Sequence, residues 1–181
     1  MKHDTNNPST GRYNNRTNPL LRLMLCMLTL ASTVAWSHAA TSETVEVAEV
    51  KTVIGTYAKS IDAADVTLAA QIWLTESSVS FIHPRGHERG WEQVKTNFYQ
   101  KTMGERFSER KLTIRDLAVQ VNGDAAWAEF YWEFAAKMQA DGSALNTRGR
   151  ETQVLTKTEQ GWRIVHVHYS GMPVTGERQG F

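Results

Sequence analysis

The stretch Gly161-Trp162-Arg163-Ile164-Val165-His166-Val167-His168-Tyr169-Ser170-Gly171-Met172-Pro173 decides the fold class of this chain. Its β-branched and aromatic residues are typical of a strand. Because side chains on a strand alternate between two faces, regular alternation predicts one face that carries Trp162, Ile164, His166, His168 and Ser170. An aromatic anchor followed by two imidazoles and a hydroxyl indicates that this face forms the wall of a partly polar pocket.

Further strands precede this one. Alternating patterns predict long strands over 111–121, 125–138 and 147–157, joined by short turns, and a short strand over 79–83. Within 125–138, Trp132 and Phe134 lie on a predicted apolar face, and Trp127 and Tyr131 lie on the opposite face with charged residues between them. The second face is therefore expected to meet a partner subunit.

Helical patterns occupy the first half of the domain. Apolar residues at spacings of three and four predict a helix over 43–61, and two shorter helices are expected over 66–74, where Asp65 can cap the start, and over 90–103. Helices followed by long antiparallel strands define an α+β class. We expect a curved antiparallel sheet that three N-terminal-side helices pack into a cone, with a pocket inside it.

The N-terminal segment has the pattern of a secretory signal peptide. A basic region is followed by an apolar run from Leu23 to Ala35 and then by small residues up to Ala40. We expect residues 1–40 to be a signal peptide cleaved after Ala39 or Ala40, which predicts a periplasmic or secreted protein with no membrane attachment. The alternative is an uncleaved N-terminal anchor. Residues 41–174 would form one domain, and 175–181 a C-terminal tail.

Composition excludes some functions of the mature chain. The only cysteine, Cys26, lies inside the apolar run, so residues 41–181 can form no disulfide and no thiol nucleophile. These residues contain 16 Lys and Arg against 18 Asp and Glu. A nucleic-acid partner is not expected, because phosphate neutralisation needs a basic face.

The mature region resembles the nuclear transport factor 2-like superfamily, which includes SnoaL-like proteins. The similarity is greatest to the association (hub) domain of calcium/calmodulin-dependent protein kinase type II. It rests on Val79-Ser80-Phe81-Ile82-His83-Pro84, Asn97-Phe98-Tyr99, Gly149-Arg150-Glu151-Thr152-Gln153-Val154 and the stretch from Trp162 to Val174. The last motif is the most specific of these.

The resemblance implies a helix-covered curved sheet that associates through its outer face. It also implies a deep pocket, lined by arginine, histidine and aromatic groups, that accepts small carboxylates. Kinase activity is not implied, because the chain has no Gly-rich loop, His-Arg-Asp loop or Asp-Phe-Gly motif. We therefore expect a homo-oligomer, with the homodimer as its simplest form.

His166 and His168 are the candidate catalytic residues if the protein is an enzyme, because imidazole titrates near neutral pH. The alternative is a pair of structural, hydrogen-bonded histidines. A His-x-His pair can also chelate a metal together with His83 or His87, but no third ligand is signalled, and we predict no metal site and no cofactor.

The candidate ligand-binding residues are mostly basic or aromatic. An inward Arg150 could clamp an anion, or it could pair with Glu129 or Glu133 across the sheet. Trp132 is either core or a ligand platform, and a carboxylate base is available only at Asp62, Asp65 or Asp116, none of them in a motif. The full predicted ligand-binding set is Arg150, Arg148, Tyr57, Trp91, Trp132 and His83.

Three functions compete on these observations. The first is a secreted, oligomerising domain that binds a small molecule, such as a carboxylate. The second is an isomerase, dehydratase or cyclase of the ketosteroid isomerase or SnoaL kind, with a pocket histidine as general acid and base. The third is an assembly module that oligomerises through Trp127, Tyr131 and their neighbours.

Overall fold

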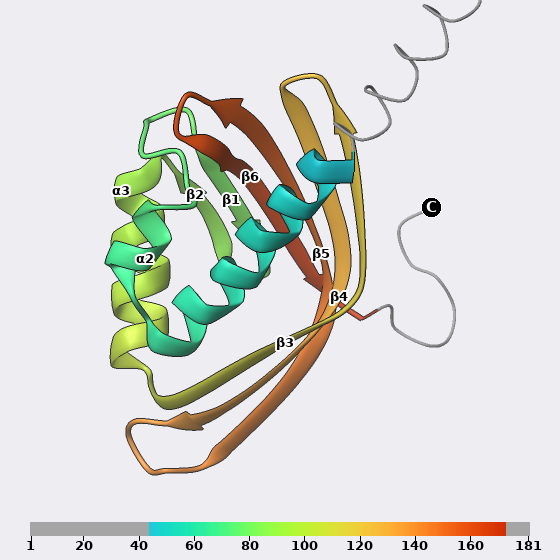
Figure 1. The fold of residues 1–181 in the computed structure, drawn as a ribbon. Coiled ribbons are helices and arrows are strands. Elements are labelled where there is room, and N and C mark those ends of the chain that lie inside the picture. Colours follow the sequence, from blue (N-terminus) through green and yellow to red (C-terminus); the bar gives the residue numbers. More distant parts are fainter. Residues whose placement is uncertain (1–43, 173–181) are drawn as a thin grey trace, which may run out of the picture. The chain divides into compact units, whose positions relative to one another are not determined.

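The computed structural model describes residues 44–172. The predicted signal peptide and C-terminal tail lie outside the described residues. A first helix, residues 44–63, runs across the concave face of a curved sheet (Figure 1). Its buried stripe of Val50, Ile54, Tyr57 and Ile61 follows the predicted helical spacing and packs into the core.

Two further helical segments complete the helical layer. The short helix α2 (Val66–Ala70) begins at Asp65, whose carboxylate accepts a hydrogen bond of 2.9 Å from the Leu68 amide, as predicted for a cap. Helix α3 (Trp91–Gln93) continues into the π-helical segment η1 (Val94–Glu105). The buried residues Phe98 and Met103 of η1 face the sheet side of the molecule and reach the cavity described below.

Six strands form one sheet in the order β2-β1-β6-β5-β4-β3. Most neighbours are antiparallel, in agreement with the predicted curved antiparallel sheet, but β1 and β6 are parallel, so the sheet is mixed. Between β1 and β6 the chain passes through β2, through α3 and η1, and through the meander of β3, β4 and β5. The strands are β1 (Ser80–His83), β2 (Gly86–Arg89), β3 (Phe107–Asn122), β4 (Ala125–Met138), β5 (Ala144–Thr158) and β6 (Gly161–Gly171).

A β-bulge in β6 changes the predicted face of its second half. Leu155 of β5 pairs with Ile164, but the preceding Val154 pairs with His166, so Val165 is an extra residue. One extra residue reverses the alternation beyond it. Trp162, Ile164 and Val167 are buried, whereas His168 is exposed. The expectation that Trp162, Ile164, His166, His168 and Ser170 share one face is therefore wrong.

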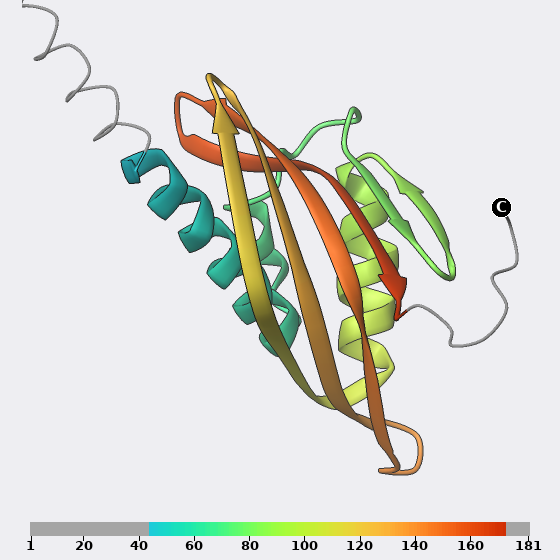
Figure 2. The ribbon, with the colours of Figure 1, turned by 90° about the vertical axis from the view of Figure 1, so that its right-hand side faces the viewer.

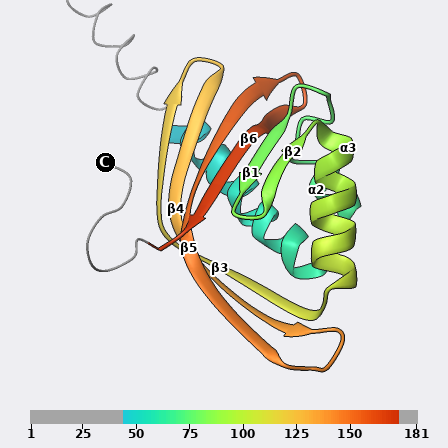
Figure 3. The same ribbon diagram turned by 180° about the vertical axis from the view of Figure 1, so that it is seen from behind.

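Strand β4 follows its predicted alternation throughout. Phe130, Trp132 and Phe134 are buried on the inner face, and Trp127 and Tyr131 are 42% and 46% exposed on the outer face. A second irregularity lies in β3 between Arg115 and Ala118, where Asp116 has a positive φ of 53°. Bulges bend strands, and Figures 2 and 3 show the long strands curving around the helices.

In the described part of the chain, no helix is long and apolar enough to cross a membrane.

Candidate functional site

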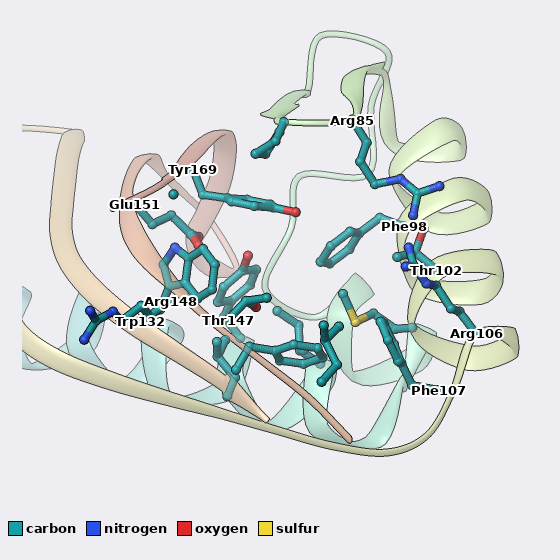
Figure 4. A pocket seen from close by; sticks show the side chains of 18 residues that line it. Arg85, Phe98, Thr102, Arg106, Phe107, Trp132, Thr147, Arg148, Glu151 and Tyr169 are labelled. Atoms are coloured by element: carbon teal, nitrogen blue, oxygen red, sulfur yellow. The ribbon is translucent and has the colours of Figure 1, made fainter. Parts of the chain in front are cut away.

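A cavity of about 380 Å³ lies between the inner face of the sheet, the first helix and η1 (Figure 4). This volume falls within the range of small-molecule sites. The walls are mainly apolar and come from β3, β4, β5, η1 and the first helix. They include Phe98, Met103, Phe107, Leu112, Trp132 and Phe134.

Glu151 is the acidic group of this cavity. It lies on the inner face of β5, opposite Phe130 of β4 and Tyr169 of β6, and only 5% of it is exposed. Its carboxylate accepts a 2.7 Å hydrogen bond from Nε2 of Gln153, a residue with no exposed surface. Burial raises the pKa of Glu151 to about 7, although the hydrogen bonds from Gln153 and Tyr57 act in the opposite direction. The carboxyl group can therefore both accept and donate a proton near neutral pH.

Two tyrosine hydroxyls accompany this carboxyl. Tyr57, from the first helix, and Tyr169, from β6, both line the cavity. Burial and the nearby Glu151 raise the pKa of Tyr57 well above its usual value. The same two causes raise the pKa of Tyr169 to about 12, against the influence of Arg85. Both phenols therefore stay neutral and available as hydrogen-bond donors.

Three arginines, Arg85, Arg106 and Arg148, also line the cavity. Figure 4 shows Arg85 and Arg106 on the side of the cavity opposite Glu151. All three, including Arg148, are exposed, and the guanidinium of Arg148 points away from the cavity. Arg148 instead helps to lower the pKa of Glu133 on the outer face. The cavity thus combines one buried acidic residue with exposed arginine residues.

The missing side chain of Gly149 allows the Trp132 ring in the cavity wall to pack closely against the backbone. It lies between Trp132 of β4 and Gly171 of β6. A Cβ atom at this position would lie 2.0 Å from the carbonyl oxygen of Ser170 and 2.5 Å from the Trp132 ring. The indole of Trp132 therefore packs against bare backbone, and it meets the Tyr169 ring edge-on at 5.5 Å.

The outer face of the sheet carries a separate, polar groove of about 500 Å³. Arg150 and His168, two of the predicted site residues, lie there with Glu129 and Asp116. Arg150 was expected to point inward because Thr152 and Val154 share its face. That expectation is wrong, since the inward face of β5 is instead the one that bears Glu151, Gln153 and Leu155.

The remaining predicted residues are dispersed. His166 is on the outer face, where its Nδ1 lies 2.6 Å from the Ser80 hydroxyl, and its pKa is lowered by burial and by the neighbouring His168 and His87. His83 lies 3.3 Å from a carboxylate oxygen of Glu88 and stacks on Tyr169. Trp91 is buried against other aromatic rings and is not part of the cavity wall. Of the predicted set, Tyr57, Trp132 and Arg148 line the inner cavity.

Sequence reasoning missed Glu151 as a site residue. One signal was available, since Glu151 shares a strand face with the strongly apolar Leu155. Val154 on the other face is just as apolar, however, so alternation alone could not choose between the two faces. The choice depends on the register of β5 against β4, which pairs Glu151 with the buried Phe130.

Within residues 44–172, no cluster of three or more His, Cys, Asp or Glu side chains is arranged to hold a metal ion. The chemistry that the described residues themselves offer is apolar binding, hydrogen bonding and proton transfer at Glu151.

Helices that cover one face of a curved mixed sheet, with a cavity between the layers, define the class of fold. The SnoaL-like domain family matches residues 50–175. A nuclear transport factor 2 (NTF2-like) superfamily protein from Salmonella enterica serovar Typhimurium is 48% identical, with a TM-score of 0.74 over 76% of this chain and 99% of that chain. This chain belongs to the SnoaL-like family of the NTF2-like superfamily.

More distant structures share the fold. The association domain of CaMKII from C. elegans is 24% identical, with a TM-score of 0.58 over 71% of this chain and 98% of that one. An NTF2-like protein from Streptomyces avermitilis, provisionally named a dehydratase, is 19% identical, with a TM-score of 0.66 over 73% of this chain and 99% of that one. None of the curated proteins matches the chain. The resemblance to the superfamily and to kinase association domains is confirmed at the level of the fold.

Proposed function

We propose that this protein binds a small, largely apolar molecule in the inner cavity. The observation that carries the proposal is an apolar cavity of about 380 Å³ with one buried carboxyl group, Glu151, in its wall. Ligand sites commonly combine apolar walls with a few polar groups that fix orientation. A carboxylate ligand remains a prediction. Such a group would be repelled by an ionised Glu151 and is better placed beside Arg85 and Arg106.

Filling the cavity tests this proposal. Thr147 lines the cavity, whereas its neighbour Asn146 is exposed and lines neither the cavity nor the outer groove. Isothermal titration with 2-phenylethanol should show binding to the wild type and to Asn146→Phe, and at least about tenfold weaker binding to Thr147→Phe, because the added ring occupies the ligand volume. Equal binding by both variants would contradict the proposal.

A proton-transfer enzyme of the isomerase, dehydratase or cyclase kind is the second candidate. Glu151 favours it, because a carboxyl group with a pKa of about 7 is suited to general acid and base catalysis. In this form of the hypothesis Glu151 takes the role first assigned to His166 and His168, and Tyr57 or Tyr169 donates a hydrogen bond to the substrate oxygen. Deuterium exchange next to the carbonyl of small ketones, followed by NMR, should be faster with wild type than with Glu151→Gln. No exchange above the buffer rate would remove this candidate.

We also propose self-association through the outer face of the sheet. Trp127 and Tyr131 are exposed there, and two structural neighbours are an association domain and a hub of CaMKII. Exposed aromatics beside charged residues suit a protein interface. Light scattering should give a homodimer or larger assembly that a Trp127→Ser, Tyr131→Ser double variant converts to monomer. A wild type that is monomeric at high concentration would contradict this.

Export to the periplasm or the medium is proposed from the sequence of residues 1–40 alone. Mass spectrometry of the full-length gene product recovered from the periplasm of a bacterial host should show a chain that begins at Ala40 or Thr41. A full-length mass in the membrane fraction would instead support the uncleaved anchor.

A further inference from the structure

The buried carboxyl of Glu151 has no charged partner in the described structure. None of the ion pairs within residues 44–172 includes it. Its partners are the neutral Gln153 and Tyr57. A buried carboxylate without a counter-ion is costly, because desolvation is not repaid by an attractive charge. A cationic group on a ligand in the cavity would provide the positive charge that the Glu151 carboxylate lacks.

Aromatic rings surround the space next to this carboxyl. Tyr57, Trp132 and Tyr169 line the cavity from three different elements, and Figure 4 shows Trp132 and Tyr169 on the same side as Glu151. Phe98 and Phe134 extend the aromatic wall. Ring faces attract cations, and more strongly where water is excluded. A buried carboxylate within aromatic walls is therefore suited to a protonated amine.

The arginines of the cavity do not remove the preference for a cationic group beside Glu151. Arg85 and Arg106 lie across the cavity from Glu151 and are exposed to solvent. Charges in water are screened over roughly 10 Å, whereas a buried charge at contact distance interacts in a medium of lower dielectric constant. A cation placed against Glu151 therefore experiences the carboxylate more strongly than the distant guanidinium groups.

We propose that the ligand of the inner cavity carries a protonated amine on an apolar body, with the ammonium group placed against Glu151. The inference rests on the proposed binding function and narrows it to one chemical class. The ammonium donates hydrogen bonds to the carboxylate, and the apolar body fills the space between Phe98, Trp132 and Phe134. A carboxylate in the same position would require Glu151 to take up a proton.

The proposal predicts a dependence of binding on pH. The groups that face or surround Glu151 are Tyr57 from the first helix, Tyr99 from η1, Tyr169 from β6 and the distant Arg85 and Arg106. The pKa values of the three tyrosines are raised, so these phenols stay neutral, whereas the pKa of Glu151 is about 7 and its carboxyl group changes charge between pH 5 and 8. Because the amine binds the ionised form, its affinity should fall as the pH drops below 7.

Three probes of similar shape and different charge test the class of ligand. These are 2-phenylethylamine, 2-phenylethanol and 3-phenylpropionate, measured by isothermal titration with the full protein. At pH 8 we expect the amine to bind at least about tenfold more tightly than the alcohol, as a charge-assisted hydrogen bond allows. At pH 5 the amine should bind at least about tenfold more weakly than at pH 8, because only a small fraction of Glu151 is then ionised.

Glu151→Gln is the decisive variant, because it keeps the shape of the side chain and removes its charge. It should weaken amine binding by about tenfold or more, and by clearly more than it weakens alcohol binding, because only the amine gains from the charge. Glu49→Gln, an identical change at an exposed position of the first helix, should alter neither. The pH series with wild-type protein gives an independent answer should Glu151→Gln fail to fold.

The outcomes separate this inference from the proposed function. Alcohol binding without an amine preference, tighter binding of the carboxylate, or amine binding unchanged in Glu151→Gln would each overturn the amine class while leaving cavity binding in place. Amine binding that does not fall between pH 8 and pH 5 would also overturn it. Failure of all three probes to bind would overturn the binding function itself together with the inference.

Discussion

The two faces of the sheet give neighbouring residues of β5 very different environments. Arg150 and Glu151 are consecutive, yet Arg150 is exposed in a polar groove and Glu151 is buried in the wall of an apolar cavity. Water screens the outer charge, and burial raises the pKa of the inner one to about 7. The same strand can thus carry an ordinary surface charge and a group suited to binding or proton transfer.

The largest effect is expected where the inner face is most tightly packed. Gly149→Ala should lower the free energy of unfolding by more than about 3 kcal/mol, because its Cβ would overlap the Ser170 carbonyl and the Trp132 ring. Chemical denaturation measures the change. Gly171→Ala is the matched control, since Gly171 pairs with Gly149 and a Cβ there meets no atom within 4 Å. Equal stabilities of the two variants would show that the inner face is packed less closely than described.

The second prediction concerns the stability of the folded state against pH. Burial raises the pKa of Glu151 from 4.5 to about 7, so the folded protein holds its proton more tightly than the unfolded chain does. The resulting stabilisation is complete below pH 4.5 and is lost as the pH rises through 7, a change of roughly 3 kcal/mol. Denaturation midpoints of wild type should fall over this range.

Glu151→Gln should remove that part of the pH dependence, because the amide does not titrate. The exposed Glu49→Gln serves as the control and should keep the wild-type slope. A wild type whose stability rises between pH 4.5 and 7 would contradict the burial of a neutral carboxyl group at this position.

A smaller effect distinguishes the two faces of β6 beyond its bulge. Val167→Ala should cost about 2 kcal/mol, because Val167 is fully buried, whereas His168→Ala should change stability by less than about 0.5 kcal/mol. Thermal unfolding of both variants provides the comparison. Regular alternation from Trp162 without a bulge would reverse the order of the two effects.

The smallest expected effect is that of substitutions on the outer face on ligand binding in the inner cavity. Arg150→Ala and His168→Ala, alone or together, should leave the affinity of the inner cavity for 2-phenylethanol within about twofold, because both residues line the outer groove. Isothermal titration would detect a larger change. A loss of binding comparable to that of Thr147→Phe would mean that the ligand occupies the outer groove instead.

Much of the fold follows from local patterns. The first helix, the cap at Asp65 and the alternation of β4 were predictable because each depends on spacing within one element. No strand was predicted over Gly86–Arg89, because these four residues have no apolar alternation, and β2 gains its order by pairing with β1. The parallel contact of β1 with β6 joins residues more than 80 positions apart and has no local signal.

The candidate site was predictable only in part, because it too depends on contacts between distant residues that leave no local signal in the sequence. Tyr57 and Trp132 were expected near a pocket, and both line the inner cavity. His166, His168 and Arg150 were assigned to the wrong face, because one extra residue at Val165 and the register of β5 decide which side chains point inward. Bulges and registers are set by pairing between strands and by the packing of the buried face.

The sequence by itself determined the α+β class, the superfamily and the helical and strand periods, because these depend on the order of apolar and polar residues along the chain. Only the tertiary structure decided that Glu151 is the acid of the cavity, since its pKa depends on the apolar side chains that distant elements place around it. A carboxyl group becomes chemically distinctive through desolvation, and desolvation is a property of the packed fold.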